Sequence, residues 1–230
     1  MIPGAEQNLL ELAARLRERD AAPIVEVGFL NYTQPLFRDA VARCAHQGAT
    51  QIVIAPYFLV AGKFVTEDLP AQIDAVRAEH PSIAISVADV IGFHERLADA
   101  VLDAAMEAHP RGTLLLMAHG SPRPEANTDI VRVADLVRAR GVYERLQVCY
   151  LDCNDPDIPT GIDLCVRDGA TEIVGIPYFL HSGKHFLRDI PRLLESARTR
   201  HPHVNIVMSD YVGHRPVMAD IVMDRIRNAI

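Results

Sequence analysis

Four side chains that can bind a metal ion or take up a proton follow predicted buried strands in the second half of the chain. His119 and Asp152 each come directly after one such strand, and His181 and His185 follow a third. Because ligands bind beyond the carboxyl ends of the strands in parallel α/β sheets, these side chains are expected at one edge of a sheet. Histidine nitrogens with one carboxylate suit a divalent first-row metal, and histidine also accepts protons near neutral pH.

His119 and His185 are the strongest candidates for catalysis and for metal binding. A solvated loop would also explain His119, but its place at a strand end agrees with that of the other three residues. His185 opens a predicted helix, and the matching position earlier in the chain is Phe64. The fold therefore does not require a histidine at that position, which favours a functional role.

His181 and Asp152 have structural explanations that are equally good. His181 matches Val60 in the earlier copy of its motif, so lining the wall of a pocket would account for it. Its spacing of four residues to His185 would serve a metal only if both lay in one helix, and the glycine between them argues against that. Asp152 matches Asn31, and capping of the next helix competes evenly with a metal or proton role.

Hydrophobic periodicity and turn residues predict alternating strands and helices, which is typical of an α/β fold with parallel strands. In the first half, helices are expected at 5–20, 34–47, 66–80 and 94–108, and strands at 24–30, 51–56 and 83–87. In the second half, strands are expected at 113–118, 147–151, 172–177 and 204–208, and helices at 125–140, 160–168, 185–200 and 216–229.

The chain carries one internal duplication. A shift of 121 residues places Gly48-Ala49-Thr50 on Gly169-Ala170-Thr171 and Pro56-Tyr57-Phe58-Leu59 on Pro177-Tyr178-Phe179-Leu180. A period of this length indicates two similar lobes, assigned to residues 1–110 and 111–230. The strand at 113–118 and its His-Gly-Ser turn have no partner in the first lobe. A start codon placed too far downstream is favoured over truncation or loss of that strand, and the first lobe is expected to be the less stable one.

Composition and charge narrow the class of protein. The 230 residues are 49% hydrophobic and 23% charged, which is ordinary for a globular protein with a sizeable core. The formal charge of -7 argues against a nucleic-acid or anionic-membrane surface. No apolar run approaches the roughly 18 residues of a membrane span, and no secretory signal is visible. The cysteines form neither a disulfide framework nor a zinc pattern, so a cytoplasmic protein with reduced thiols is expected.

Two motifs of the second half begin in predicted buried strands. The phrase Leu115-Leu116-Met117-Ala118-His119-Gly120-Ser121, followed by Pro124-Glu125-Ala126-Asn127, is similar to the opening motif of the CbiX-type sirohydrochlorin chelatase family. The phrase Pro177-Tyr178-Phe179-Leu180-His181-Ser182-Gly183-Lys184-His185, running on to Asp189-Ile190-Pro191, is similar to its second motif. The resemblance covers essentially the whole chain and both copies.

This resemblance implies a class II chelatase fold, with two similar α/β lobes and an active-site cleft between them. It implies insertion of cobalt(II) or iron(II) into sirohydrochlorin, on the way to cobalamin or sirohaem, without ATP or an organic cofactor. The family's two catalytic histidines map onto His119 and His185, and its metal-associated acidic residue maps onto Asp152, where glutamate is more usual. A monomer or weak homo-oligomer without membrane or nucleic-acid partners is expected.

The first lobe departs from the pattern expected of long two-lobe members. There the working histidines are expected in the first lobe, whereas this chain has Phe64 and no His-Gly-Ser turn in that lobe. The activity is therefore expected to rest on the second lobe.

A flat tetrapyrrole with many carboxylates needs an apolar surface rimmed by cations. Tyr178, Phe179 and Leu180 are predicted to supply the apolar wall. Lys184 and Arg188 are predicted to supply the rim charges, because cations bind carboxylates strongly. Ser121 and His181 complete the predicted set of substrate-binding residues.

Two other functions compete with metal insertion. A non-catalytic relative that binds a metal or a tetrapyrrole would need the same residues without accelerating insertion. An α/β hydrolase would use His119, Asp152 and His185 as metal ligands, but no further carboxylate cluster accompanies them. Ser121 also lacks the Gly-x-Ser-x-Gly sequence of a nucleophile elbow.

Overall fold

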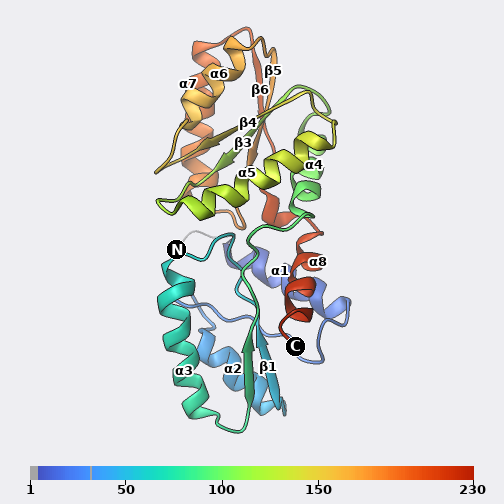
Figure 1. Ribbon diagram of the computed structural model, residues 1–230, viewed down its shortest axis with the longest axis vertical. Coiled ribbons are helices and arrows are strands. Elements are labelled where there is room, and N and C mark those ends of the chain that lie inside the picture. Colours follow the sequence, from blue (N-terminus) through green and yellow to red (C-terminus); the bar gives the residue numbers. More distant parts are fainter. Residues whose placement is uncertain (1–4, 32) are drawn as a thin grey trace. The chain divides into compact units, whose positions relative to one another are not determined.

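The computed structural model describes residues 5–31 and 33–230, and it divides the chain into two compact units (Figure 1). We call the unit built mainly of Phe93–Met218 the second lobe. The first lobe consists of Glu6–Gly92 and Ala219–Ile230. The last helix of each sequence copy therefore lies in the other lobe. A division of the sequence at residue 110 does not predict this exchange.

A four-stranded parallel sheet forms the centre of the second lobe. Its strands are β3 (Thr113–Ala118), β4 (Arg145–Tyr150), β5 (Glu172–Pro177) and β6 (Asn205–Met208). The order across the sheet is β4-β3-β5-β6, so β3 pairs on both sides. Every residue of β3 is buried, which explains its nearly continuous apolar sequence.

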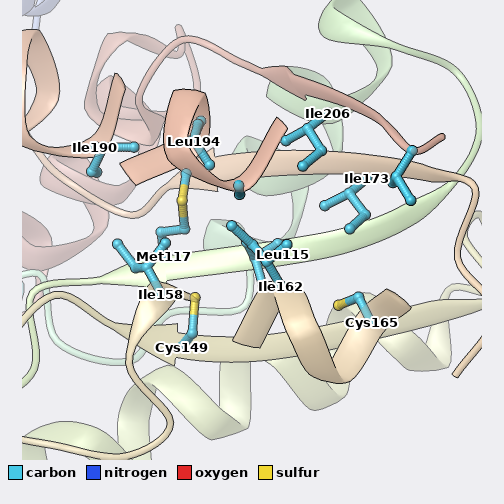
Figure 2. Packing of buried hydrophobic residues seen from close by; sticks show 12 residues of the cluster. Leu115, Met117, Cys149, Ile158, Ile162, Cys165, Ile173, Ile190, Leu194 and Ile206 are labelled. Carbon is cyan, nitrogen blue, oxygen red and sulfur yellow. The ribbon is translucent and has the colours of Figure 1, made fainter. Parts of the chain in front are cut away.

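Two pairs of helices pack on the sheet of the second lobe. Helices α6 (Ile158–Arg167) and α7 (Ile190–Arg200) cover one face, while α4 (Leu97–Ala108) and α5 (Pro124–Ala139) pack together against β5 and β4. Figure 2 shows how α6 and α7 bury their apolar sides against the strands. The residues at the centre of that core include Leu115, Met117, Ile158, Ile162, Ile173 and Leu194. This core holds the strand ends that carry the candidate site.

The first lobe has a smaller sheet. Strands β1 (Gln51–Ile54) and β2 (Ala84–Val87) pair in parallel. Helices α2 (Phe37–His46) and α3 (Leu69–Glu79) pack on these strands through Phe37, Val41, Leu69, Ile73 and Val76. The lobe also contains α1 (Ala5–Glu18) and nearly all of α8 (Met218–Arg227), and Arg19, just after α1, forms an ion pair with Asp220 of α8.

The prediction of a strand at 24–30 is wrong. In the second lobe the matching strand, β4, pairs with β3 alone, and the described part of the first lobe has no strand that corresponds to β3. Segment 24–30 therefore has only one isolated bridge, between Phe29 and Leu36. Arginine side chains satisfy part of its backbone instead, since Arg17 donates to the Val25 carbonyl at 3.1 Å.

The predicted α/β fold class and the duplication are confirmed. Helix α2 and helix α6 begin 121 residues apart, and so do α3 and α7, and β2 and β6. The helices predicted at 66–80 and 185–200 each begin with one turn of π-helix, at η1 (Phe64–Asp68) and η2 (His185–Asp189). Such turns occur frequently at functional sites.

Two further features agree with the sequence analysis. All four cysteines are free thiols. In the described residues, no helix is long and apolar enough to cross a membrane.

Candidate active site

The loop that carries His119 is tied closely to the end of strand β4. The sheet hydrogen bonding continues past β3, because Leu151 N donates to Ala118 O and Asp152 N donates to His119 O, both at 2.9 Å. Gly120 has a φ of +88°, and a Cβ atom there would collide with the Asp152 carbonyl. Only glycine allows the two loops to approach so closely, which fixes where His119 leaves the sheet.

His185 lies at the start of η2, and a carboxylate orients its ring. Its Nδ1 lies 2.8 Å from Oδ2 of Asp189, four residues later in the same turn. The Nδ1–H group donates to this carboxylate, so the Nε2 lone pair is left for a metal ion or a proton. The side chain keeps 44% of its surface exposed, so the ring is accessible from solvent.

The fold brings His119 and His185 together from ends of neighbouring strands. Their ring centroids are 5.1 Å apart, with an interplanar angle of 79°. Nδ1 of His119 lies 3.3 Å from the carbonyl of Gly120, which can only accept a hydrogen bond. His119 therefore favours the same tautomer as His185, with the lone pair on Nε2. The pair offers one nitrogen lone pair on each ring at the carboxyl edge of the sheet.

Asp152 lies beside this pair, but its carboxylate is engaged within its own loop. Oδ1 of Asp152 accepts a hydrogen bond of 2.8 Å from Cys153 N. The capping role considered for Asp152 belongs to Asp157, whose side chain accepts from Thr160 N at the start of α6. Among the described residues, no group of three histidine, cysteine, aspartate or glutamate side chains is arranged to hold a metal ion.

The predicted apolar wall lies mostly inside the lobe. Tyr178 is only 3% exposed, and burial raises the pKa of its hydroxyl. Phe179 is half-buried and packs against the core between the sheet and helices α6 and α7. These side chains support the end of β5. Leu187, two residues after His185 in the sequence, is an apolar side chain that is 49% exposed.

The remaining predicted substrate-binding residues lie around η2 and the His119 loop. Lys184 and Arg188 are exposed. Oγ of Ser121 accepts a hydrogen bond from Arg123 N at 3.1 Å. His181 lies outside the helix, as expected, and is exposed. Desolvation by the surrounding protein lowers the pKa of its imidazole.

Sequence reasoning missed several groups at this edge. Asp189 lies within the second motif. Its spacing of four residues from His185 in a helical turn would have indicated that the two side chains meet. His214 follows β6 and lies 2.5 Å from Asp210 through Nδ1. The shift of 121 residues pairs His214 with Phe93, just as it pairs His185 with a phenylalanine. The same comparison would therefore have singled out His214.

Replacing Asp189 with asparagine tests the orientation of His185. The amide cannot accept the Nδ1–H hydrogen bond with the strength of a carboxylate, so we expect metal affinity and metal-insertion rate to fall by about 10–100-fold. Asp68 occupies the matching position of η1, where the neighbouring residue is Phe64. Asp68→Asn is the matched control and should leave both quantities within about twofold of wild type, since surface substitutions have small effects. Equal losses in the two variants would contradict an orienting role.

The comparisons with known proteins identify the family. The chain belongs to the CbiX family, whose model matches residues 2–108 and, a second time, residues 113–229. The boundary between the matches falls just before β3, in agreement with the duplication.

Named relatives match over nearly the whole chain. The chain is 26% identical over 231 residues to a sirohydrochlorin ferrochelatase of Priestia megaterium, covering 99% of this chain and 85% of the relative. It is 22% identical to a sirohydrochlorin cobaltochelatase of the same organism, covering 90% of this chain and 69% of the relative.

The fold agrees with a solved structure. SirB from Bacillus subtilis with Fe3+ superposes with a TM-score of 0.85 at 24% identity, over 97% of this chain and 89% of that one. A fold with two similar α/β lobes is thus shared with that structure.

Proposed function

We propose that this protein inserts a divalent metal ion, cobalt or iron, into sirohydrochlorin, for the biosynthesis of cobalamin or sirohaem. The protein is a chelatase of the CbiX family, and the metal ion is a substrate of the reaction. The observation that carries the proposal is the pair of histidine rings 5.1 Å apart on the segments that follow β3 and β5. Two accessible imidazole lone pairs are what a transient metal site requires, because a permanent site would hold the ion too firmly.

The reaction exchanges one metal ion for two protons of the tetrapyrrole. The ion enters the ring, two pyrrole N–H bonds break, and two protons must be accepted. In the proposal, Nε2 of His119 and Nε2 of His185 first hold the metal ion, and its transfer to the ring releases both lone pairs. These lone pairs then accept the two protons, so no additional base is required. General-base assistance of this kind accelerates reactions by about 10²–10⁴-fold.

Asp189 favours both stages of this exchange. While Nε2 of His185 binds the metal, the hydrogen bond from Nδ1–H to the carboxylate fixes the direction of the ring. When Nε2 takes up a proton, the same hydrogen bond keeps the ring in place. Asp152 is proposed to assist at the metal, which would require its carboxylate to leave the hydrogen bond with Cys153 N.

Local cations bind the carboxylates of the tetrapyrrole in this proposal. With a net charge of -7, the whole chain does not attract an acidic substrate, so nearby positive charges must do so. Lys184 and Arg188 flank His185 and are exposed. His181, Phe179 and Ser121 are proposed to contact the ring or its arms, whereas the buried position of Tyr178 suits a supporting role.

The proposal also covers the cofactor requirement, the cellular compartment and the partners of the protein. It requires no organic cofactor, because the exchange involves neither electron transfer nor group transfer. Free thiols at all four cysteines suit the reducing cytoplasm. We propose a monomer or weak homo-oligomer without nucleic-acid or membrane partners.

An absorbance assay of metal insertion tests the proposed function. Sirohydrochlorin is mixed with Co2+ or Fe2+ under anaerobic conditions, with and without the protein, and the change in the absorption spectrum of the tetrapyrrole is followed. We expect the protein to accelerate insertion of at least one of these metals by 10²-fold or more, on the order of a general-base contribution. Rates equal to the uncatalysed rates for both metals would refute the proposed enzymatic activity.

A non-catalytic binding role is the second candidate. Phe64 stands at the first-lobe position that corresponds to His185, so half of the duplicated scaffold lacks this histidine. A carrier would bind the metal or the tetrapyrrole tightly without accelerating insertion. The same assay, combined with titration of ligand binding, separates the two candidates.

A further inference from the structure

The peptide groups of Ser121 are held on both sides by side-chain amides from two different elements. Oδ1 of Asn154 accepts a hydrogen bond of 2.8 Å from Ser121 N. Nδ2 of Asn127 donates a hydrogen bond of 2.9 Å to Ser121 O. Asn154 lies in the loop after β4, and Asn127 lies in the first turns of α5. The His119–Gly120–Ser121 loop is thereby fastened to both of its neighbours.

The chemistry of these two bonds defines which amide atom faces the loop. The carbonyl of Ser121 can only accept, so Asn127 must present its NH₂ group. The N–H group of Ser121 can only donate, so Asn154 must present its oxygen. The other atom of Asn127, Oδ1, is buried and has no hydrogen-bond partner within the described residues. A buried acceptor left unpaired costs free energy, so packing alone does not account for an asparagine there.

These bonds act on His119 through a short and otherwise adaptable connection. Gly120, between His119 and Ser121, has a φ of +88° and no side chain to restrict it. Because glycine has more conformational freedom than any other residue, the direction of His119 depends on how its neighbours are held. Asp152 N holds the carbonyl of His119 at 2.9 Å, and the two asparagines hold the far side of the glycine.

We propose that Asn127 and Asn154 are positioning residues that keep His119 beside His185. The inference rests on the proposed function for its kinetic consequence, since the position of His119 matters for metal insertion. A displacement of about 1 Å at a reacting group can reduce a rate about 10²-fold. Neither asparagine contacts the reacting atoms in this proposal, so both act by holding the loop.

Substitution of aspartate for each asparagine separates the two bonds while keeping the shape of the side chain. Asn154→Asp keeps an oxygen facing Ser121 N and preserves the hydrogen bond. Asn127→Asp removes the donor and places a carboxylate against the carbonyl of Ser121, which repels it. The added charge lies near the N-terminus of α5, where the helix dipole offsets part of the cost of this repulsion, so the variant is expected to fold with reduced stability. Asn154→Ala removes the acceptor entirely.

The expected kinetic results differ among these variants. For Asn127→Asp and Asn154→Ala, kcat for insertion should fall by about 10–100-fold, with KM for sirohydrochlorin within about twofold of wild type. For Asn154→Asp, kcat should stay within about threefold of wild type. Asn228→Asp, at an exposed position after α8, adds the same charge elsewhere and should leave kcat unchanged. Thermal unfolding of each variant reports whether the fold is retained.

A measurement that does not depend on activity decides the positioning role directly. In NMR spectra of the protein with labelled histidine, wild type and Asn154→Asp should each show one set of His119 ring resonances. Asn127→Asp and Asn154→Ala should show shifted, broadened or additional sets. Identical His119 resonances in wild type and Asn127→Asp would overturn the inference, and so would equal kcat losses in the two aspartate variants. If the wild-type protein failed to insert metal, the proposed function would fall, and the NMR comparison would still decide the positioning role.

Discussion

Alanine in place of His185 is expected to reduce the rate of metal insertion by about 10²–10⁴-fold while leaving the fold intact. The ring is exposed over 44% of its side-chain surface and contributes little to the core, so its removal should not unfold the lobe. The variant keeps His119, which can still bind a metal weakly through one nitrogen. We therefore expect Co2+ affinity, measured by titration calorimetry, to fall together with the rate.

The duplication provides a matched control for this substitution. Phe64 occupies the corresponding position of the first lobe, at the start of η1, and is 49% exposed. Phe64→Ala removes a ring from the same local structure and leaves both histidines in the chain. Its insertion rate should stay near that of wild type. His185→Phe, which reproduces the first-lobe residue, should be as inactive as His185→Ala, and retention of wild-type rates by either variant would remove His185 from the mechanism.

Replacing Gly120 with alanine is expected to destabilise the second lobe by about 2–5 kcal/mol. The positive φ of +88° and the collision of a Cβ atom with the Asp152 carbonyl both contribute, because the carbonyl belongs to backbone that cannot move aside cheaply. Native proteins are stable by only about 5–15 kcal/mol, so this loss is large. Denaturant unfolding followed by circular dichroism measures it.

Two further glycines separate the causes of this destabilisation. Gly169 has a φ of +87° but nothing within 4 Å of the added Cβ, so Gly169→Ala isolates the backbone strain of about 1–2 kcal/mol. Gly183 has neither a positive φ nor a close neighbour, so Gly183→Ala should lie within about 1 kcal/mol of wild type. If Gly120→Ala were no more destabilising than Gly169→Ala, the close approach of the two loops would not constrain residue 120.

The sequence predicted most elements of the second lobe and fewer details of the first. Strand β3 was predicted with its observed bounds, because a strand with neighbours on both sides and helices on both faces has an unbroken apolar pattern. The strand predicted at 24–30 does not form. A strand exists only through hydrogen bonds to a neighbour, and local sequence does not reveal whether that neighbour is present.

The geometry of the candidate site was only partly predictable. The placement of His119 and His185 at one sheet edge followed from their positions after strands, and their contact confirms that they lie together. Asp152 also follows a strand, yet its carboxylate bonds to Cys153 N, because the turn of its own loop offers the nearest donor. Side-chain direction at a strand end depends on such local competition, which spacing does not encode.

The sequence by itself determined the duplication, the parallel α/β class and the two histidines, because these depend on periodicity and on residue type. Only the tertiary structure decided what holds the histidines in place. Asp189 orients one ring, and Asn127 and Asn154 fasten the loop of the other. The two asparagines lie 27 positions apart in the sequence (154 − 127), and packing of α5 and of the loop after β4 brings both to Ser121. Contacts of this kind follow from how the elements pack, so they appear only once the chain is folded.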